Sequence, residues 1–213
     1  MNMAFERVLV LSPHTDDGEM AAGGTIARLA AEGRDLLYVA LSSCEASVPE
    51  GFPPDVLKVE CMQSVAVLGI PTGRVVLLNY AVRNFPSSRQ EILEDVVRLN
   101  KDFRPDLVLV PSSNDLHQDH HVVHEEALRA FKMTSTILGY EHPWNNLGFT
   151  TDVFVNLEER HIVRKIDSLK KYGSQQSKAY FSEEYVRALA YTRGTQVGFR
   201  YAEAFELVRL RIS

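Results

Sequence analysis

Short apolar segments alternate with amphipathic segments through the first two thirds of the chain, and this alternation limits the folds open to it. The apolar segments, each typical of a buried strand, are residues 7–12, 36–42, 75–78 and 107–110. The segments with helical periodicity that follow them are residues 20–32, 56–68, 87–102 and about 120–131. Such alternation predicts a parallel sheet with helices on both faces. We therefore expect an α/β fold, a Rossmann-like three-layer sandwich with a mostly parallel sheet.

The last third of the chain is less regular. Strands are expected at residues 152–155 and 205–210, and helices at residues 158–172 and 183–191. The helix at 158–172 is expected to turn inward Ile162, Val163, Ile166 and Leu169. The helix at 87–102 is expected to start with a capping box of Ser88 and Glu91. No segment is long enough to act as a linker, so residues 1–213 are expected to form a single domain.

Composition excludes several classes of protein. The net charge is −5 and the basic residues are scattered, so we expect no nucleic-acid surface, which needs a concentrated basic patch. No stretch reaches the ~20 apolar residues of a membrane span. Residues 1–7 lack the apolar run of a signal peptide, so a cytoplasmic location is expected. Cys44 and Cys61 form no CxxC pair, which argues against a disulfide framework or a four-cysteine zinc site.

The strands at 7–12 and 107–110 are each followed by a loop rich in histidine and acidic residues. The first loop, residues 13–19, reads Pro-His-Thr-Asp-Asp-Gly-Glu, and the second, residues 111–120, reads Pro-Ser-Ser-Asn-Asp-Leu-His-Gln-Asp-His. In a doubly wound sheet, ligands bind beyond the carboxyl ends of the strands where the strand order reverses. If the two strands are neighbours there, both loops face the same crevice.

The polar side chains of these loops suit a metal ion. They are His14, His117, His120, Asp16, Asp17, Asp115 and Asp119, with Glu19 close by. Like charges repel strongly in a cleft of low dielectric, and a divalent cation removes that cost. Mixed imidazole and carboxylate ligands suit zinc, and also iron, cobalt or nickel. Three protein ligands with one open position is the usual pattern of a catalytic zinc site.

The motifs in these loops are those of a known family. They are Pro13-His14-Thr15-Asp16-Asp17-Gly18-Glu19, Gly23-Gly24-Thr25-Ile26-Ala27 and Asp115-Leu116-His117-Gln118-Asp119-His120. In this order they resemble the PIG-L/LmbE-like family of metal-dependent N-acetylglucosaminyl deacetylases. Ser174-Gln175, Arg193-Gly194, Gly198 and residues 201–205 are similar to later elements of the same family. Thr15 and Gln118 stand where the family often has proline, which affects loop stiffness more than chemistry.

The resemblance implies an LmbE-like fold and a zinc-dependent hydrolase, with iron as the alternative metal. Such an enzyme removes an N-acetyl group from a small amino-sugar-containing substrate, with a metal-bound water as nucleophile. The resemblance implies His14, Asp17 and His120 as metal ligands. It implies Asp16 as the general base and His117 as the second catalytic group. The resemblance also allows the protein to form a homo-oligomer.

Neighbouring carboxylates are expected to support these groups. Asp119 or Asp115 is expected to hold the His117 ring and keep it cationic. Glu19 is expected to support the site near His14 or at the start of the following helix. Either Asp16 or His117 can protonate the leaving amine.

Several other residues have two interpretations each. Arg83, in the loop at 79–86, either binds a hydroxyl, carboxylate or phosphate of the substrate or lies on the surface. Trp144 either stacks on a sugar or packs in an interface. Cys44 is expected to line the pocket rather than act as a nucleophile. For His121 and His124 we favour a solvated or supporting position over metal ligation. Gly23-Gly24 either brings its helix close to the sheet or serves packing alone, and Ser174-Gln175 is expected to organise a helix end near the site.

Three alternatives to an N-deacetylase have to be weighed. The same residues suit hydrolysis of another amide or of an ester. A non-catalytic metal-binding protein would not need Asp16 and His117. A dinucleotide-binding protein is disfavoured, because the first loop lacks Gly-x-Gly-x-x-Gly and its aspartates would repel a pyrophosphate.

Overall fold

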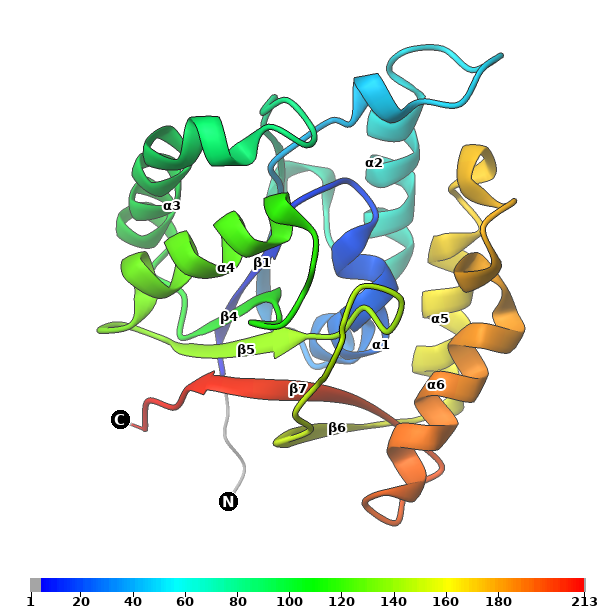
Figure 1. Ribbon diagram of the computed structural model, residues 1–213. Coiled ribbons are helices and arrows are strands. Elements are labelled where there is room, and N and C mark those ends of the chain that lie inside the picture. The colour runs from blue at the N-terminus through cyan, green and yellow to red at the C-terminus, as the bar shows by residue number, and fades with distance from the viewer. Residues whose placement is uncertain (1–4, 213) are drawn as a thin grey trace.

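A computed structural model describes residues 5–212 of the chain. Within this range the strands form one mixed sheet of seven strands in the order β3-β2-β1-β4-β5-β7-β6 (Figure 1). The strands are β1 (Arg7–Ser12), β2 (Asp35–Ala40), β3 (Val75–Leu77), β4 (Leu107–Pro111), β5 (Thr136–Tyr140), β6 (Val153–Leu157) and β7 (Tyr201–Arg209). The first five run parallel, and β7 is antiparallel to both β5 and β6. Residues 1–4, on which the expected lack of a signal peptide partly rests, lie outside the described range.

Helices cover both faces of this sheet (Figure 1). They are α1 (Asp17–Ala31), α2 (Val56–Leu68), α3 (Arg89–Phe103), α4 (Gln118–Phe131), α5 (Glu159–Leu169) and α6 (Glu183–Thr195). Buried side chains of α3 and α4 share one hydrophobic cluster, and those of α1, α2, α5 and α6 share the other. The expected α/β sandwich of three layers with a mostly parallel sheet is therefore confirmed.

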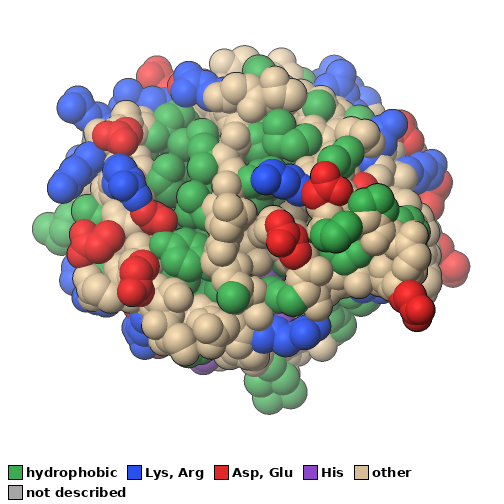
Figure 2. Space-filling model, turned by 90° about the horizontal axis from the view of Figure 1, so that it is seen from above, with side chains coloured by type: hydrophobic (Ala, Val, Ile, Leu, Met, Phe, Trp, Pro, Cys, Tyr) green, Lys and Arg blue, Asp and Glu red, His purple; other side chains and the backbone are tan. Residues whose placement is uncertain are grey.

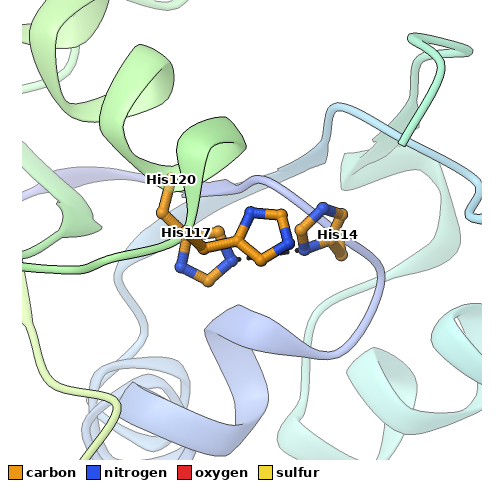
Figure 3. Close-up of side chains that lie close together, drawn as sticks. All are labelled: His14, His117 and His120. Atoms are coloured by element: carbon orange, nitrogen blue, oxygen red, sulfur yellow. Dashed lines mark hydrogen bonds between the residues drawn. The ribbon is translucent and has the colours of Figure 1, made fainter. Parts of the chain in front are cut away.

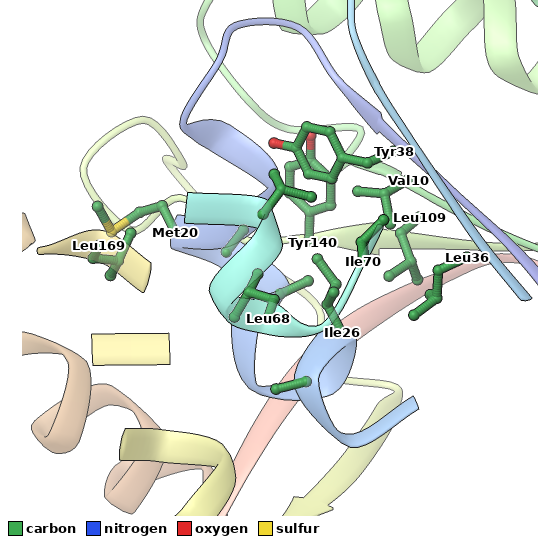
Figure 4. Packing of buried hydrophobic residues seen from close by; sticks show 14 of the residues in the cluster. Val10, Met20, Ile26, Leu36, Tyr38, Leu68, Ile70, Leu109, Tyr140 and Leu169 are labelled. Carbon is green, nitrogen blue, oxygen red and sulfur yellow. The ribbon is translucent and has the colours of Figure 1, made fainter. Parts of the chain in front are cut away.

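The central strands are buried on both faces, which explains their unbroken apolar sequence. In β1, Val8 and Val10 belong to the cluster beneath α1, whereas Leu9 and Leu11 belong to the cluster beneath α3 and α4. Successive side chains of a strand point to opposite faces, so a strand between two helical layers needs apolar residues at every position. Figure 4 shows part of the first cluster, in which Tyr38 and Val10 of the sheet lie near residues of α1 and α2.

Strand β1 lies between β2 and β4 and runs parallel to both. The chain builds β2 and β3 on one side of β1 and then crosses to add β4 and β5 on the other side. The strand order therefore reverses between β1 and β4, and the loops that follow these two strands emerge at the same edge. The predicted crevice depended on β1 and β4 being neighbours, and the structure confirms that they are.

Strand β5 was absent from the sequence-based expectation. It is short, and Gly139 lies within it, which weakens the strand signal of the sequence. The glycine is favoured because a Cβ atom there would stand 3.0 Å from the Cα atom of Ser112, the residue after β4. The strand is buried throughout, and it carries residues 141–146 to the edge where the two polar loops lie.

Several element bounds also differ from expectation. Helix α1 begins at Asp17 rather than near residue 20, β7 begins at Tyr201 rather than 205, α5 ends at Leu169 and α6 continues to Thr195. Val163, expected to face inward, is 38% exposed. Ser88 precedes α3 as expected, but its side chain accepts no capping hydrogen bond, so the predicted capping box is wrong.

The Gly23-Gly24 pair brings α1 close to its neighbours. A Cβ atom on Gly23 would lie 2.9 Å from a side-chain carbon of Lys165 in α5, and one on Gly24 would lie 2.5 Å from a methyl carbon of Leu157 in β6. The close approach expected of the pair is thus observed, toward α5 and the end of β6.

Among residues 5–212, no helix combines the length and the apolar character that crossing a bilayer requires.

Candidate active site

The first polar loop is folded back on itself by hydrogen bonds. The Ser12 hydroxyl accepts from the Gly18 amide at 3.0 Å and donates to the His14 carbonyl at 2.5 Å. The His14 amide donates to Oδ2 of Asp17 at 2.8 Å. Gly18 is needed because a Cβ atom there would stand 2.8 Å from the Tyr38 ring. The loop thereby turns the side chains of His14 and Asp17 toward the crevice between β1 and β4.

The second loop brings two histidines to the same place. His117 occupies the N-cap position of α4, and His120 lies in the first turn of that helix. Figure 3 shows the rings of His14, His117 and His120 gathered together, although His14 and His120 are 106 residues apart in sequence. From the side on which these loops lie, little histidine surface is visible (Figure 2). His14 and His120 are buried and His117 is half-buried.

Three donor atoms, from His14, Asp17 and His120, converge here, and these three residues form the donor cluster. Nδ1 of His14 lies 3.0 Å from Oδ2 of Asp17, and Nε2 of His120 lies 3.2 Å from the same oxygen. The two ring nitrogens are 3.2 Å apart. Ligands held ~2.0–2.1 Å from a tetrahedral zinc ion are separated by about 3.3–3.4 Å. The set therefore fits a small divalent cation with little rearrangement.

The second nitrogen of each of these two rings binds a carboxylate. Nε2 of His14 lies 3.0 Å from Oδ2 of Asp119, and Nδ1 of His120 lies 2.7 Å from Oδ2 of Asp115. An ionised carboxylate only accepts hydrogen bonds, so these nitrogens carry the protons. The opposite nitrogens, which face Asp17 and each other, are then the ones that can give up their protons and bind a metal ion.

The local charges raise the proton affinity of both rings. Burial disfavours the imidazolium form, but Asp17 and Asp119 outweigh it and raise the pKa of His14 to about 10. Burial is likewise outweighed by Asp17 and Asp115, which raise the pKa of His120 to about 9. In Asp17, burial is outweighed by His120 and His14, which hold the pKa of its carboxyl well below the usual range. The pocket thus stabilises positive charge between these groups, which a metal ion would supply in place of protons.

Asp16 faces the cavity beside this cluster. It holds the N-cap position of α1, yet its side chain accepts no capping hydrogen bond. Burial, and then the charge of Asp17, raises the pKa of Asp16 above its usual range. A carboxylate with a raised pKa is a stronger base, so Asp16 has the chemistry of a proton acceptor.

His117 differs from its expected state. The Asp119 amide donates to Nδ1 of His117 at 3.2 Å, and the Asp115 carboxylate binds the His117 amide at 2.9 Å rather than the ring. Burial, followed by the charges of His120 and His14, lowers the pKa of His117 to about 4. The expectation that Asp119 or Asp115 keeps this ring cationic is therefore wrong. Because Nδ1 accepts the helix cap, the proton lies on Nε2 and the ring is neutral.

Glu19 lies in the first turn of α1 but does not support His14. Its carboxylate binds the hydroxyl groups of Tyr38 and Tyr172, the second at 2.8 Å, and it is fully buried beneath the loop. Burial raises the pKa of Glu19 to about 8. Glu19 thus lies at the start of the helix, one of the two positions expected for it, and contacts the tyrosines rather than His14.

His142 is a site residue that sequence reasoning missed. Fully buried just after β5, it places Nδ1 3.3 Å from Oδ2 of Asp115 and Nε2 3.3 Å from the carbonyl oxygen of Asp17. Asp17, His120 and His142 form a second set of side chains close enough to share an ion, and so do His14, His117 and His120. The only sequence signal for His142 is its place after β5, a strand that was not predicted.

The other candidate residues divide between the cavity and the exterior. His121 is exposed, and His124 is buried with Nδ1 2.8 Å from the Pro111 carbonyl, so neither reaches the donor cluster. Cys44 lines the cavity, and burial raises the pKa of its thiol to about 12, which does not suit a nucleophile. The Trp144 ring stacks on Tyr180 with centroids 4.0 Å apart.

Arg83 lies at the cavity in a strained backbone conformation, with φ of 67°. Its amide donates to Oδ2 of Asp119 at 2.5 Å, the same carboxylate that binds His14. A non-glycine residue rarely adopts positive φ unless its surroundings hold it there. The Asp119 carboxylate does so, and it thereby links Arg83 to the donor cluster.

The donor cluster forms part of the wall of a cavity of about 290 Å³. Its other lining residues are Thr15, Asp16, Met20, Cys44, Ser47, Leu57, Val82, Arg83, His117, Trp144, Asn145, Gln175, Lys178 and Tyr180. The size is close to the lower limit of about 300 Å³ for small-molecule sites. Mixed polar, aromatic and aliphatic walls suit a ligand with both hydroxyl groups and apolar ring faces.

Known proteins share this sequence pattern and fold. The chain is 27% identical to the uncharacterized deacetylase YaiS of Escherichia coli, over 78% of this chain and 90% of that protein. It is 26% identical to the diacetylchitobiose deacetylase of Thermococcus kodakarensis, over 95% of this chain and 83% of that protein. The fold also matches the crystal structure of GalB, the 4-carboxy-2-hydroxymuconate hydratase of Pseudomonas putida, with a TM-score of 0.79, 20% identity and 98% of each chain covered.

The match to GalB, a hydratase, shows that this fold does not determine the reaction by itself. The assignment therefore depends on the sequence family. The sequence profile of PIG-L, GlcNAc-PI de-N-acetylase, matches residues 9–131, which include both polar loops. Since this match covers more than half of the chain, the protein belongs to the PIG-L family of de-N-acetylases.

Proposed function

We propose that this protein is a metal-dependent deacetylase that hydrolyses the acetamido group of a small N-acetylated sugar or sugar conjugate. The observation that carries the proposal is the mutual separation of 3.0–3.2 Å among Nδ1 of His14, Oδ2 of Asp17 and Nε2 of His120. Family membership supports the reaction, and the related diacetylchitobiose deacetylase supports the substrate class.

The ion would be held by His14, Asp17 and His120, with zinc as the first choice and iron as the alternative. Asp119 and Asp115 would fix the two imidazole rings through their second nitrogens. When bound, the ion would polarise the amide carbonyl and make a water molecule nucleophilic near neutral pH. His142, which contacts Asp115 and the Asp17 backbone, would keep these two groups in position around the ion.

Asp16 and His117 would supply the proton chemistry. Asp16 accepts the proton of the attacking water, since its raised pKa strengthens it as a base. His117 has its Nδ1 engaged by the helix cap, so its Nε2–H is available to donate to the oxyanion that develops on the substrate carbonyl. Asp16 then carries a proton that it can pass to the leaving amine.

The remaining cavity residues would contact the sugar. Arg83 is the candidate for binding a hydroxyl, carboxylate or phosphate group, because its backbone is fixed by Asp119 while its side chain is exposed at the cavity. Trp144 offers an aromatic surface, part of which is covered by Tyr180. The whole chain would act as a single domain, since the catalytic groups come from β1 through α4 and other cavity residues come from later segments.

Acetate release tests the proposal. The purified protein should be loaded with zinc or Fe²⁺ and incubated with N-acetylglucosamine, N,N′-diacetylchitobiose, nucleotide-linked and lipid-linked N-acetylglucosamine, and simple acetyl esters. We expect acetate and a free amine from at least one acetamido sugar, with loss of activity in chelator and recovery on adding metal. Turnover of esters alone would favour the other hydrolase, and metal binding without turnover of any substrate would favour a binding protein.

A further inference from the structure

Gln175 occupies a buried position in the cavity wall that the proposed chemistry does not use. Its side chain is 3% exposed and lines the cavity that contains Asp16. The same segment is tied to the first polar loop, because the Tyr172 hydroxyl donates to the Thr15 carbonyl at 2.5 Å. The segment that carries Gln175 is therefore anchored to the residue that precedes Asp16, and all three of Gln175, Thr15 and Asp16 line the same cavity.

A buried carboxylate on α2 organises this segment. Glu60, which is 7% exposed, accepts from the Ser174 amide at 2.9 Å through Oε1 and from the Ser174 hydroxyl at 2.6 Å through Oε2. The side-chain amide of Gln175 then contacts the Ser174 hydroxyl oxygen at 3.0 Å. Glu60 lies one helical turn after Leu57, which itself lines the cavity.

The direction of these hydrogen bonds fixes which end of the Gln175 amide faces Ser174. A carboxylate only accepts, so the Ser174 hydroxyl must give its single proton to Glu60. The Ser174 oxygen can then only accept, and Nε2 of Gln175 must be the atom that donates to it. The carbonyl oxygen Oε1 is left on the other side, and among residues 5–212 no hydrogen bond reaches it. It is not one of the fully enclosed side-chain atoms that lack a partner in this range, so on a residue that lines the cavity it keeps access to a ligand or water there.

We propose that Gln175 is a substrate-recognition residue whose side-chain carbonyl accepts a hydrogen bond from an N–H or O–H group of the acetamido sugar. Glu60 is the positioning residue that, through Ser174, presents this carbonyl instead of the amide NH₂ group. The inference rests on the proposed function and names a specificity determinant of that same cavity.

The variant Glu60→Gln provides the sharpest test. The Ser174 amide still needs an acceptor, so the new amide would turn its oxygen toward that group and its NH₂ toward the Ser174 hydroxyl. The hydroxyl proton would then point to Gln175, which would rotate to accept it and would present NH₂ to the cavity. We expect KM for N,N′-diacetylchitobiose to rise about tenfold, as for loss of one hydrogen bond, with kcat changed less than threefold.

Gln175→Leu should raise KM by a similar factor, and combining it with Glu60→Gln should add little, because both changes remove the same acceptor. Independent effects would instead multiply to about a hundredfold. Gln176→Leu is the matched control: Gln176 is the next residue, and its amide donates to the Leu169 and Tyr172 carbonyls. We expect it to alter thermal stability and leave KM unchanged. If Gln175→Leu does not fold, Gln175→Met removes the acceptor with less change in shape.

Binding should be measured as well, by calorimetry with N-acetylglucosamine and N,N′-diacetylchitobiose in an Asp16→Asn background that slows turnover. The dissociation constants should rise with the same pattern as KM. A wild-type enzyme that deacetylates these sugars while Gln175→Leu and Glu60→Gln keep the native KM and Kd overturns this inference and leaves the proposed function intact. Failure of the native protein to bind or hydrolyse any of the free, nucleotide-linked or lipid-linked acetamido sugars overturns both.

Discussion

The two histidine donors are each fixed at both ring nitrogens. Nδ1 of His14 and Nε2 of His120 face Oδ2 of Asp17, while Asp119 and Asp115 bind the opposite side of each ring. Rotation of either ring would break a buried hydrogen bond to a carboxylate, which is costly in the protein interior. The donor atoms are therefore held in place before any metal arrives.

His120→Ala should abolish tight metal binding, because it removes one of three donors and one of the imidazole partners of the buried carboxylates of Asp17 and Asp115. His121→Ala is the matched control, since His121 is the next residue on α4 and is exposed. Elemental analysis after dialysis should find one equivalent of metal in the control and far less than one in His120→Ala. Full occupancy in His120→Ala would mean that the donor set is different, with His142 as the first replacement to examine.

Asp16→Asn should retain the metal and lose roughly 100-fold or more in kcat, the usual range for loss of a general base. The asparagine keeps the shape of the side chain but cannot take up a proton. Metal content and turnover should be measured on the same preparation. Native turnover in a fully loaded Asp16→Asn sample would transfer the role of base to another group.

At this scale, the sequence allowed the identity of the clustered residues to be predicted but not their hydrogen bonding. The two loops that carry His14 and His120 were expected to meet, and they do. The neutral state of His117 could not be foreseen, because it depends on which ring nitrogen accepts the cap of α4. Glu19 lies at the start of the helix, one of the two positions expected for it, but its partners Tyr38 and Tyr172 come from elements distant in the sequence and could not be foreseen.

At the scale of single elements, helix ends with similar sequences behave differently. Ser182 caps α6 by accepting from the Tyr185 amide at 3.2 Å, whereas Ser88 before α3 makes no such bond. The residues ahead of α3 form the short helix η3 (Phe85–Ser88), so Ser88 already has its backbone in a helical turn. A cap needs an extended backbone at this position, as Ser182 has with ψ of 146°.

Ser182→Ala should therefore lower the free energy of unfolding by about 1 kcal/mol. Ser88→Ala should change it by less than about 0.5 kcal/mol, as surface substitutions away from special features usually do. Urea titrations of the two variants under the same conditions compare them directly. Equal losses in both would show that the distinction between these two helix starts does not hold in solution.

Gly24→Ala should destabilise the fold, although alanine favours a helix by ~1 kcal/mol over glycine. The added carbon would stand 2.5 Å from Leu157 and 3.1 Å from Oε1 of Glu203, which is held by Lys165 at 2.7 Å. Overpacking of this kind costs ~1–3 kcal/mol. Gly73→Ala, where the new carbon meets nothing within 4 Å, is the control and should be neutral. Thermal unfolding of both proteins checks the expectation, and a native melting temperature for Gly24→Ala would contradict it.

At the scale of the whole molecule, the order of strands β1 to β4 could be predicted from the sequence, whereas the places of β5, β6 and β7 in the sheet could not. Alternating strands and helices from β1 to β4 follow the rules of parallel α/β proteins, so the place where the two loops meet could be derived. β5 is short and interrupted by Gly139, and no local pattern indicates that β7 runs antiparallel between β5 and β6. His142 was missed together with β5, because a residue after an unpredicted strand has no predicted location.

The donors that converge on the proposed metal come from the two halves of the chain, with His14 and His120 106 residues apart. An ion shared by them would act as a reversible cross-link between β1 and α4, and a ligand that binds only the native state stabilises it in proportion to its occupancy. Chelation should thus lower the melting temperature and speed digestion by a protease, and adding zinc should reverse both; identical melting curves with and without chelator would argue against such a cross-link. With such a cross-link, the lifetime of the protein in a cell would depend on how much free zinc or iron the cell contains. Metal starvation would then lower the amount of the protein as well as its activity.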